Sequence, residues 1–269
     1  MNVDQPVPNP PADEQTVEQQ ARRRTIKAFI GLGLASLVPV GVWRWVRTQP
    51  TRGGAPQPLL ETHKVNAKVF EGLIGPERLA PTFPESMAAN PARVNGGIGL
   101  SPATPATDWQ LRLERSPTDS QLLTMDDIRA LPKHEQVIEF KCVEGWSQVQ
   151  HWGGVRLVDF LDRYGAGART GQPVSKVDPA SRYNYVGLET PNRGYYVGID
   201  MASALHPQTL LAYELNGEPI SAKHGAPLRL LIPIKYGIKN LKCIGHIFFA
   251  DGPPRDFWAE QGYDYFSGL

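Results

Sequence analysis

The sequence contains very few cysteines, two in 269 residues. So small a number excludes a disulfide framework and a cysteine-rich zinc site. The Cys-x-x-Cys-His motif of a covalently attached c-type heme is also absent. No charge of either sign is in excess, because 28 basic residues face 27 acidic ones and the formal net charge is +1. We therefore expect neither a nucleic-acid partner nor an acidic tail.

Long hydrophobic runs are scarce, and the one that stands out is residues 28–46, with no charge before Arg44. A membrane helix needs ~20 apolar residues, with ~17 as a lower bound, so this run is at the short end. The basic residues 22–24 and Lys27 before it resemble a twin-arginine export signal, but no small-x-small cleavage site follows. We therefore predict an uncleaved single-pass anchor in the inner (cytoplasmic) membrane, with the chain after residue 50 in the periplasm.

Composition divides the chain into four parts. Residues 1–20 are rich in Pro, Glu and Gln and are expected to be disordered. Residues 21–47 hold the predicted membrane anchor or signal anchor. Residues 48–94 carry many Pro and Gly residues and are expected to form a linker and an irregular wrap. Residues 95–269 have the hydrophobic alternation of a packed domain.

The periodicity of residues 95–269 predicts many short strands and a few short helices. Thr124 is expected to cap a helix, with Asp127 in place of the capping-box Glu. The pair Asn216-Gly217 is typical of a two-residue hairpin turn, from which Ile220 begins the return. Since the strands outnumber the helices and pair locally, the predicted class is α+β with mixed, mainly antiparallel sheets. The expected strands are 109–113, 137–140, 185–189, 195–199, 211–215, 228–234 and 244–249, and the expected helices begin at 125, 157 and 201.

Cys142 ends an apolar, strand-like run and is followed at once by a glycine-containing loop. A thiolate at the end of a strand can bind a soft metal or attack an electrophile. The alternative from local context alone is a buried, inert cysteine, because free cysteine is among the most buried residue types. The second cysteine, Cys243, enters an apolar strand and is expected to be structural.

A glycine loop at residues 95–100 and five further motifs follow one another along the chain. No strand–turn–helix frame surrounds the glycine loop, so it does not indicate a dinucleotide site. The five motifs are the segments 142–147, 152–155, 185–190, 224–229 and 235–242. Together they resemble the molybdopterin-binding domain of the sulfite oxidase family, in the bacterial branch near the periplasmic methionine-sulfoxide reductase catalytic subunit, over roughly residues 95–269.

The resemblance implies a molybdenum ion held by the dithiolene of a pterin cofactor, with Cys142 as the protein's metal ligand. Arg229 and Lys242 match positions that hold the phosphate tail of the cofactor. The planar fork of an arginine and the point charge of a lysine both suit a phosphate. The other positions that match cofactor contacts are Asn95, Thr190, His224, Asn240 and Leu241, the last two through backbone groups.

The activity implied is two-electron oxygen-atom transfer on a small S-oxide, N-oxide or related substrate. Tyr195 roughly matches a tyrosine that lines the metal pocket, although Tyr196 beside it leaves the choice open. Sulfite oxidases place an arginine about five residues after the ligand cysteine; here that position is Ser147, which weighs against an anion such as sulfite. Without a heme motif, the chain is expected to use a separate heme- or quinone-linked membrane electron carrier of cytochrome b or c type.

Two alternatives stay open. A non-catalytic, membrane-tethered binding or assembly protein could have kept the fold, and the missing pocket arginine favours it. A cysteine hydrolase would need a His/Asn pair beside Cys142, for which His151 is a candidate. The ordered set of motifs favours the molybdenum oxidoreductase.

Overall fold

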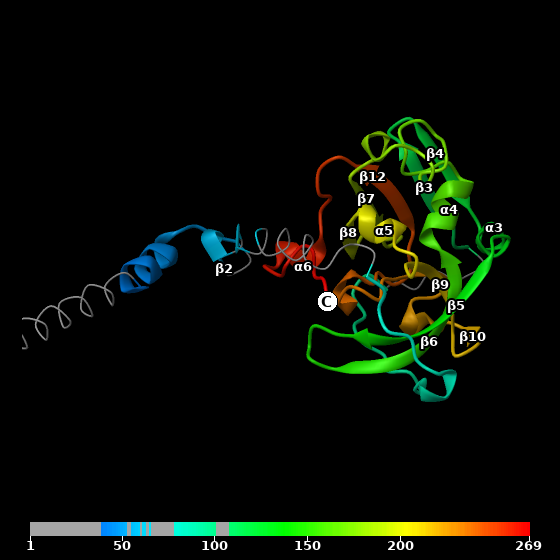
Figure 1. Cartoon of the computed structure of the whole chain (residues 1–269), viewed down its shortest axis with the longest axis horizontal. Helices are drawn as coiled ribbons and strands as arrows, with labels where there is room; N and C mark the ends of the chain where they lie inside the picture. Colours follow the sequence, from blue (N-terminus) through cyan, green and yellow to red (C-terminus); the bar gives the residue numbers. More distant parts are fainter. Residues whose placement is uncertain (1–38, 53–54, 60, 63–64, 66–77, 101–107) are drawn as a thin grey trace, which may run out of the picture. The chain divides into compact units, whose positions relative to one another are not determined.

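The computed structural model describes residues 39–52, 55–59, 61–62, 65, 78–100 and 108–269. The chain divides into two compact units. The smaller unit comprises Met1–Thr51 and Pro56–Leu59, and the larger comprises Arg52–Ala55 and Leu60–Leu269. In the smaller unit, residues 39–48 are helical. The larger unit carries both of the five-stranded sheets, whose strands are drawn in green to red in Figure 1.

The predicted membrane segment, residues 28–46, is described only from residue 39 onward. Residues 1–38, with the expected disordered stretch and the basic residues before the apolar run, lie outside the described residues. Within the part of the chain that the structure describes, no helix combines the length and the apolar character that crossing a bilayer requires. This finding contradicts the predicted single-pass location at the inner membrane with a periplasmic catalytic domain, and that prediction is corrected.

The larger unit consists of short elements. Its strands are β3 (Leu111–Ser116), β4 (Asp119–Leu123), β5 (Lys133–Lys141), β6 (Ser147–Arg156), β7 (Tyr185–Glu189), β8 (Tyr196–Asp200), β9 (Leu210–Leu215), β10 (Glu218–Pro219), β11 (Arg229–Leu231) and β12 (His246–Ala250). Its α-helices are α3 (Met125–Arg129), α4 (Leu157–Arg163), α5 (Met201–Leu205) and α6 (Phe257–Glu260). Its 3₁₀ turns are η1 (Glu85–Met87), η2 (Pro179–Ser181), η3 (Ala222–His224) and η4 (Gly237–Lys239), and a two-stranded ladder, β1 (Thr51–Arg52) with β2 (Ala55–Pro56), precedes them.

Two five-stranded sheets form the larger unit (Figure 1). One has the order β10-β9-β6-β5, with β11 also paired to β9, and the other has the order β4-β3-β12-β7-β8. Among the described strand pairs, β12 with β3 is parallel and the others in these sheets are antiparallel. Helix α4 contacts β6 and α5, while α5 contacts β7 and β8, so the two helices connect the sheets. The predicted α+β class with mainly antiparallel sheets is confirmed.

The first sheet separates two hydrophobic clusters, because successive side chains of a strand point to opposite faces. On β9, Leu211 and Tyr213 join the main cluster, which also contains the apolar residues of the second sheet. Leu210 and Ala212 belong to a smaller cluster on the other face. This smaller cluster includes Trp152 and lies under the pocket described below.

Most predicted elements are present, and several signals act as expected. Thr124 caps α3, and its side chain and that of Asp127 form the reciprocal hydrogen bonds of a capping box. Asn216 and Gly217 both have positive φ, as the hairpin turn between β9 and β10 requires. The return strand is earlier than predicted, at Glu218–Pro219, and β11 is shorter than residues 228–234.

Strand β6 was not predicted, and it is the partner of both β5 and β9. Its polar residues and its two glycines break the expected alternation of apolar residues. Gly154 is required by close packing, since a Cβ there would lie 2.2 Å from the carbonyl oxygen of Leu211. The hydrophobic pattern therefore does not reveal this strand, because its central residues allow the backbone of β9 to pass close by and face a polar pocket.

Candidate active site

Cys142 occupies the turn of the long hairpin formed by β5 and β6. Its backbone N–H donates to the carbonyl of Trp146, and Gly145, with φ of 85°, donates back to the carbonyl of Cys142. The left-handed conformation suits glycine, which has no Cβ to clash. This turn directs the thiol into a pocket, where the residue is 5% exposed. The thiol is thus held at the end of a rigid ladder rather than on an isolated loop.

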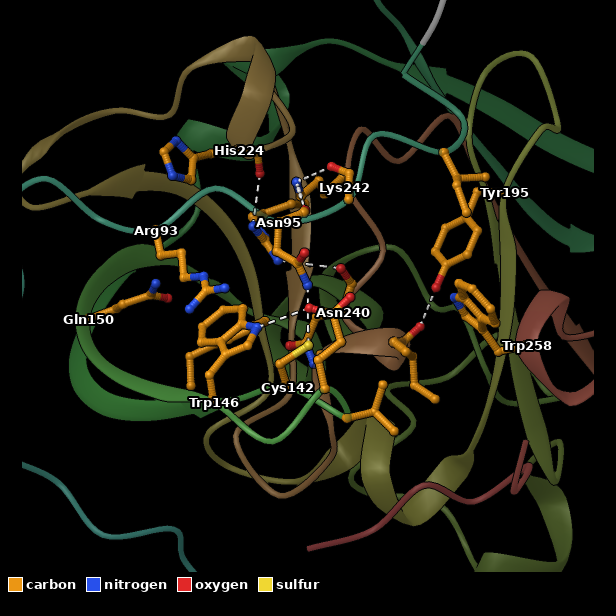
Figure 2. Close-up of a pocket in the computed structure, with 18 of the residues that line it drawn as sticks. Arg93, Asn95, Cys142, Trp146, Gln150, Tyr195, His224, Asn240, Lys242 and Trp258 are labelled. Atoms are coloured by element: carbon orange, nitrogen blue, oxygen red, sulfur yellow. Dashed lines mark hydrogen bonds between the residues drawn. The ribbon is translucent and has the colours of Figure 1, made fainter. Parts of the chain in front are cut away.

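The glycine loop at residues 95–100 reaches the same place from a distant part of the sequence. Asn95 Nδ2 donates to Cys142 Sγ at 3.2 Å. Lys242 Nζ donates to the carbonyls of Asn95 and Gly96, the latter at 2.8 Å, and to that of Lys223, also at 2.8 Å. A single ammonium therefore fixes the loop that carries Asn95 over the sulfur (Figure 2).

Three cations line the pocket, and two of them, Arg229 and Lys242, are buried or partly buried. Arg229 is 3% exposed, and its guanidinium donates to the carbonyls of His224 at 2.9 Å and Asn240 at 3.3 Å. Neither Arg229 nor Lys242 forms an ion pair with any residue that the structure describes. Burial lowers the pKa of Arg229 to about 10, and burial followed by the charge of Arg229 lowers the pKa of Lys242 to about 8.

Several polar atoms of the pocket also lack partners. Gln150 Oε1, Trp152 Nε1 and His224 Nε2 are buried and have no hydrogen bond of good geometry to any described residue. For His224 the nearby carbonyls of Ala92 and Arg93 favour the protonated ring, but burial and the two cations outweigh them and lower its pKa. Buried polar groups are normally satisfied, so these atoms indicate a ligand with several polar groups.

The pocket has a volume of about 970 Å³, part of it open to solvent. In Figure 2, Arg93, Gln150 and His224 lie on one side of Cys142, and Tyr195 and Trp258 lie on the other. The full lining is Arg93, Asn95, Gly96, Ile98, Phe140, Cys142, Val143, Glu144, Trp146, Gln150, Trp152, Tyr195, His224, Arg229, Gly237, Ile238, Asn240, Lys242, Trp258 and Tyr263.

Tyr195, and not Tyr196, lines this pocket. The phenol of Tyr195 donates to the carbonyl of Ile238 at 2.6 Å, and its pKa is raised by burial and by the negative charge of Asp256. Tyr196 points elsewhere and donates to Glu260. The backbone N–H of Tyr195 donates to the hydroxyl of Thr190, which closes the turn between β7 and β8 and sets the direction of the tyrosine.

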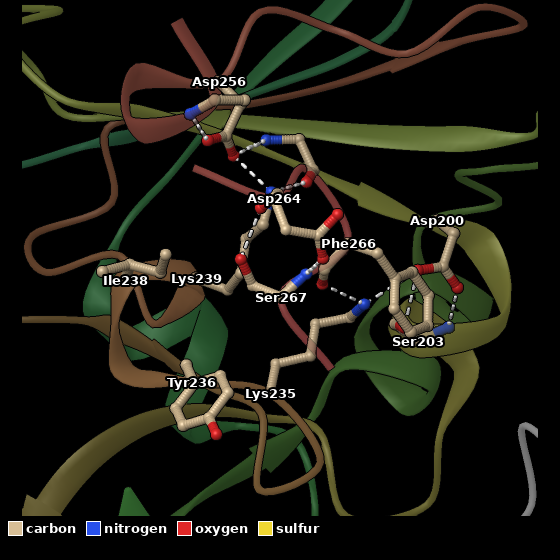
Figure 3. A network of polar contacts seen from close by, with 12 residues as sticks. Asp200, Ser203, Lys235, Tyr236, Ile238, Lys239, Asp256, Asp264, Phe266 and Ser267 are labelled. Atoms are coloured by element: carbon tan, nitrogen blue, oxygen red, sulfur yellow. Dashed lines mark hydrogen bonds and ion pairs between the residues drawn. The ribbon is translucent and has the colours of Figure 1, made fainter. Parts of the chain in front are cut away.

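The wall formed by residues 236–240 is fixed from behind by two buried ion pairs (Figure 3). Lys239 pairs with Asp256, and Lys235 pairs with Asp200 at 3.2 Å. Removing one partner of such a pair leaves an uncompensated buried charge, at a cost of about 3–5 kcal/mol. These pairs therefore hold the carbonyl of Ile238 in place for Tyr195.

Of the predicted site residues, most come together and two do not. The pocket lining contains Asn95, Cys142, Tyr195, His224, Arg229, Asn240 and Lys242. Thr190 lies behind Tyr195, and Leu241 is fully buried in the main core, with its backbone N–H donating to Lys239 and its carbonyl accepting from Leu230. A cofactor contact by Thr190 or Leu241 stays a prediction that the lining does not support.

Sequence reasoning missed several side chains of the pocket, notably Arg93, Gln150, Trp258 and Tyr263. Sequence analysis found Ser147 where sulfite oxidases have an arginine. The pocket nevertheless has a positive charge from Arg93, whose guanidinium lies 4.4 Å from the centre of the Trp146 ring. Trp258 and Tyr263 come from the last residues of the chain and contact each other edge to face. Gln150 had no usable signal either, because the strand that carries it was not predicted.

The site suits an anionic cofactor that already coordinates a metal ion. Among the described residues, no cluster of three or more His, Cys, Asp and Glu side chains could hold a metal ion. Cys142 instead offers a single soft donor, which suits a metal already held by other soft ligands. Arg229 and Lys242 offer uncompensated charge to a phosphate. An α+β domain with such a site is a binding domain for an anionic, sulfur-ligated metal cofactor.

The chain belongs to the family described as "Oxidoreductase molybdopterin binding domain", which matches residues 99–258. It is therefore an oxidoreductase of the sulfite oxidase type whose cofactor is molybdenum–molybdopterin. The resemblance given by the sequence motifs is confirmed. Asn95 lies before the matched residues, yet the structure brings it to the sulfur of Cys142.

Two curated relatives show what the chain resembles. It is 36% identical over 212 residues to the "Putative protein-methionine-sulfoxide reductase subunit YedZ1" of Azospira oryzae, covering 78% of this chain and 76% of that protein. It is 31% identical over 190 residues to the "Protein-methionine-sulfoxide reductase catalytic subunit MsrP" of Xanthomonas campestris pv. campestris, covering 67% of this chain and 56% of that protein. The chain thus spans little more than half the length of the second relative.

Among solved structures, the sulfane dehydrogenase SoxCD of Paracoccus pantotrophus matches with a TM-score of 0.46 and 17% identity. The match covers 56% of this chain and 40% of that one.

We expect cofactor retention to fall as the pH rises above about 8. The pKa of Lys242 is about 8 in the cofactor-free pocket, and an anion beside it raises that pKa. Binding the tail therefore takes up a proton at pH values between the two pKa values, so affinity falls as the pH rises through this window. Fluorescence of released pterin between about pH 7 and pH 9.5 measures the effect. Lys242→Arg keeps its charge throughout and should flatten the profile; an equally flat wild-type profile would contradict the prediction.

Proposed function

We propose that this chain catalyses two-electron oxygen-atom transfer at a molybdenum ligated by Cys142, on a small S-oxide, N-oxide or related substrate. The observation that carries the proposal is the thiol of Cys142 in a pocket that also holds Arg229 and Lys242, neither of which pairs with a carboxylate of the described residues. In the direction of reduction, R₂S=O with two electrons and two protons gives R₂S and water. When bound, the cofactor supplies the two-electron centre that accepts or releases the oxygen atom.

The residues of the pocket divide by role. Cys142 supplies the thiolate, and Asn95 donates a hydrogen bond to its sulfur, which lowers the electron density that the sulfur offers a metal. Arg229 holds the phosphate tail, and Lys242, whose three N–H donors are used by the carbonyls of Asn95, Gly96 and Lys223, adds positive charge near it. His224 adds a buried ring on the same side, and the carbonyl of Asn240 orients Arg229. These assignments rest on the charge and contacts of each group and on the family of the chain.

The opposite side of the pocket suits a substrate. Tyr195 keeps its proton because burial raises its pKa, so it does not act as a base at neutral pH. Its one O–H donates to the carbonyl of Ile238 and can donate to a substrate oxygen only by exchanging that partner. Trp258 and Tyr263 add aromatic surface that an apolar sulfoxide or amine oxide can contact. Arg93, which could attract an anion such as sulfite, lies on the far side of Cys142 in Figure 2. The names of the two relatives also favour an S-oxide.

Residues 95–269 are proposed as the molybdopterin-binding oxidoreductase domain, with residues 48–94 as a linker and wrap before it. The electrons are proposed to come from a separate heme- or quinone-linked carrier of cytochrome b or c type. The two cysteines of this chain form no heme-attachment motif, and the pocket already uses one of them.

Purified, cofactor-loaded protein tests the proposal when it is assayed with S-oxides, N-oxides and sulfite, using a reduced viologen dye as electron donor and ferricyanide as acceptor. We expect turnover with apolar S-oxides or N-oxides, and kcat/KM for sulfite at least about 100-fold lower, equivalent to about 2.7 kcal/mol. Sulfite oxidation as the fastest reaction would reject the substrate class. Full loading with no turnover on any substrate would favour a binding or assembly protein that has kept the fold.

A further inference from the structure

Gln150 is a buried polar residue of the pocket with no assigned role. It lies in the middle of β6, is 2% exposed, and has Gln148 and Trp152 on either side of it along the same face of the strand. Its Oε1 atom is buried and has no hydrogen-bond partner in the described structure. Leaving such an acceptor unpaired in the interior is unfavourable, which calls for a compensating ligand.

The hydrogen bonds of the neighbouring residues determine which end of the Gln150 amide faces the pocket. The backbone N–H of Arg93 can only donate, and it donates to Gln148 Oε1 at 2.8 Å. Gln150 Nε2 donates to the same Gln148 Oε1 at 3.0 Å. Flipping either amide would bring two donors or two acceptors face to face. Oε1 of Gln150 is therefore the atom left over, and the ligand must offer it a donor.

Trp152 presents the complementary group two residues further along β6. It is 1% exposed, and its Nε1–H, which can only donate, has no partner among the residues that the structure describes. The guanidinium of Arg229 lies 4.7 Å from the centre of its ring. One strand thus offers the pocket an unpaired acceptor and an unpaired donor, next to a buried positive charge.

We propose that Gln150 and Trp152 bind the pterin part of the cofactor, with Gln150 Oε1 accepting a hydrogen bond from a pterin N–H and Trp152 Nε1 donating one to an acceptor of the same molecule. A pterin carries N–H donors, nitrogen and carbonyl acceptors and, through its tail, the negative charge that Arg229 requires. A small S-oxide or N-oxide has an acceptor oxygen but no N–H for Gln150. The proposal rests on the cofactor of the family and not on the proposed substrate.

The position of Gln150 agrees with this choice of ligand. Figure 2 shows it on the side of Cys142 that holds Arg93 and His224, away from Tyr195 and Trp258. The cation-lined side suits the anionic cofactor, whereas the aromatic side suits an apolar substrate. Both new residues also come from the strand that continues directly from the Cys142 turn, so the metal ligand and the pterin contacts share one rigid element.

Gln150→Leu in the full-length, cofactor-loaded protein tests the proposal. We expect pterin, followed by its fluorescence after dilution, to be released about fivefold faster than from the wild type, equivalent to about 1 kcal/mol for one hydrogen bond. KM for the substrate, measured per loaded molecule, should stay unchanged. Trp152→Phe removes the N–H but keeps a ring under Arg229, and we expect a similar increase in release. Gln136→Leu is the matched control: its amide lies on β5, donates to the carbonyl of Gln208 and does not line the pocket.

The outcomes separate the proposal from its alternatives. Unchanged release in both pocket variants would overturn it, and so would a shift in KM without faster release, because Gln150 would then contact the substrate. Faster release in Gln136→Leu as well would also overturn it, since the effect would then be a general loosening of the sheet. If Gln150→Leu does not fold, Trp152→Phe decides alone. A protein that shows the expected release but no S-oxide turnover would reject the proposed function and leave this inference standing.

Discussion

Replacing Cys142 by serine is expected to abolish oxygen-atom transfer while the fold is kept. Serine is close in size but is a hard oxygen donor, and it cannot supply the soft thiolate that the metal site requires. The loss should exceed the roughly 10- to 100-fold that removal of an outer-shell partner costs. Turnover per bound molybdenum measures this loss, and the electronic absorption of the loaded protein should change because a sulfur-to-metal band disappears.

Cys243→Ser is the matched control, because it removes the only other thiol. Cys243 is buried in the main core, has φ of 51° and does not line the pocket. This variant should lose some stability but keep turnover per molybdenum and the absorption spectrum. Wild-type turnover in Cys142→Ser would show that the thiol is no ligand and would revive the inert, buried cysteine that local context alone allowed.

The parts of the fold that the sequence predicts are those governed by local physics. Thr124 caps a helix because its own hydroxyl and the carboxylate of Asp127 satisfy N–H groups within the same turn. Asn216 and Gly217 form a hairpin because both tolerate positive φ. Such signals depend on a few adjacent residues, so they can be read without any knowledge of tertiary structure.

The missed strand β6 depends instead on residues far away in the chain. Gly154 is small because the backbone of β9 passes against it, and Gln150 is polar because it faces the pocket. Neither requirement is visible in the sequence around these positions. Because this strand was not predicted, a central element of the sheet and two polar groups of the pocket were missed together.

In the candidate site, too, some residues can be predicted from local motifs and others cannot. Cys142, Arg229 and Lys242 were found from ordered motifs, and the structure brings all three to one pocket. Arg93 and Trp258 were not found, because they reach the pocket from segments on either side of the strands that carry the motifs. The predicted localisation was wrong for another reason. It rested on the apolar residues 28–46, the basic residues before them and the missing cleavage site, whereas the described residues contain no helix that could cross a bilayer.

Replacing Arg229 by alanine is expected to lower cofactor occupancy much more than it alters the chemistry of molecules that remain loaded. An arginine has five N–H donors, and three are already used, on the carbonyls of Leu230, His224 and Asn240. The two that remain can bind a phosphate. Each charge-assisted bond contributes about 1.5–3 kcal/mol, so the loss of one weakens binding roughly 10- to 100-fold.

The measurement is molybdenum and pterin per protein, set against turnover per molybdenum. Because Arg229 also satisfies two carbonyls of the pocket wall, the folded fraction of the variant must be determined by thermal unfolding and the occupancy expressed per folded molecule. Arg229→Lys keeps the positive charge but not the planar fork, and it should retain an intermediate amount of cofactor. Arg156→Ala removes an arginine that pairs with Asp159 away from the pocket and should leave occupancy unchanged. Full occupancy in Arg229→Ala would show that the phosphate lies elsewhere, because the loss of the guanidinium would then remove no binding free energy.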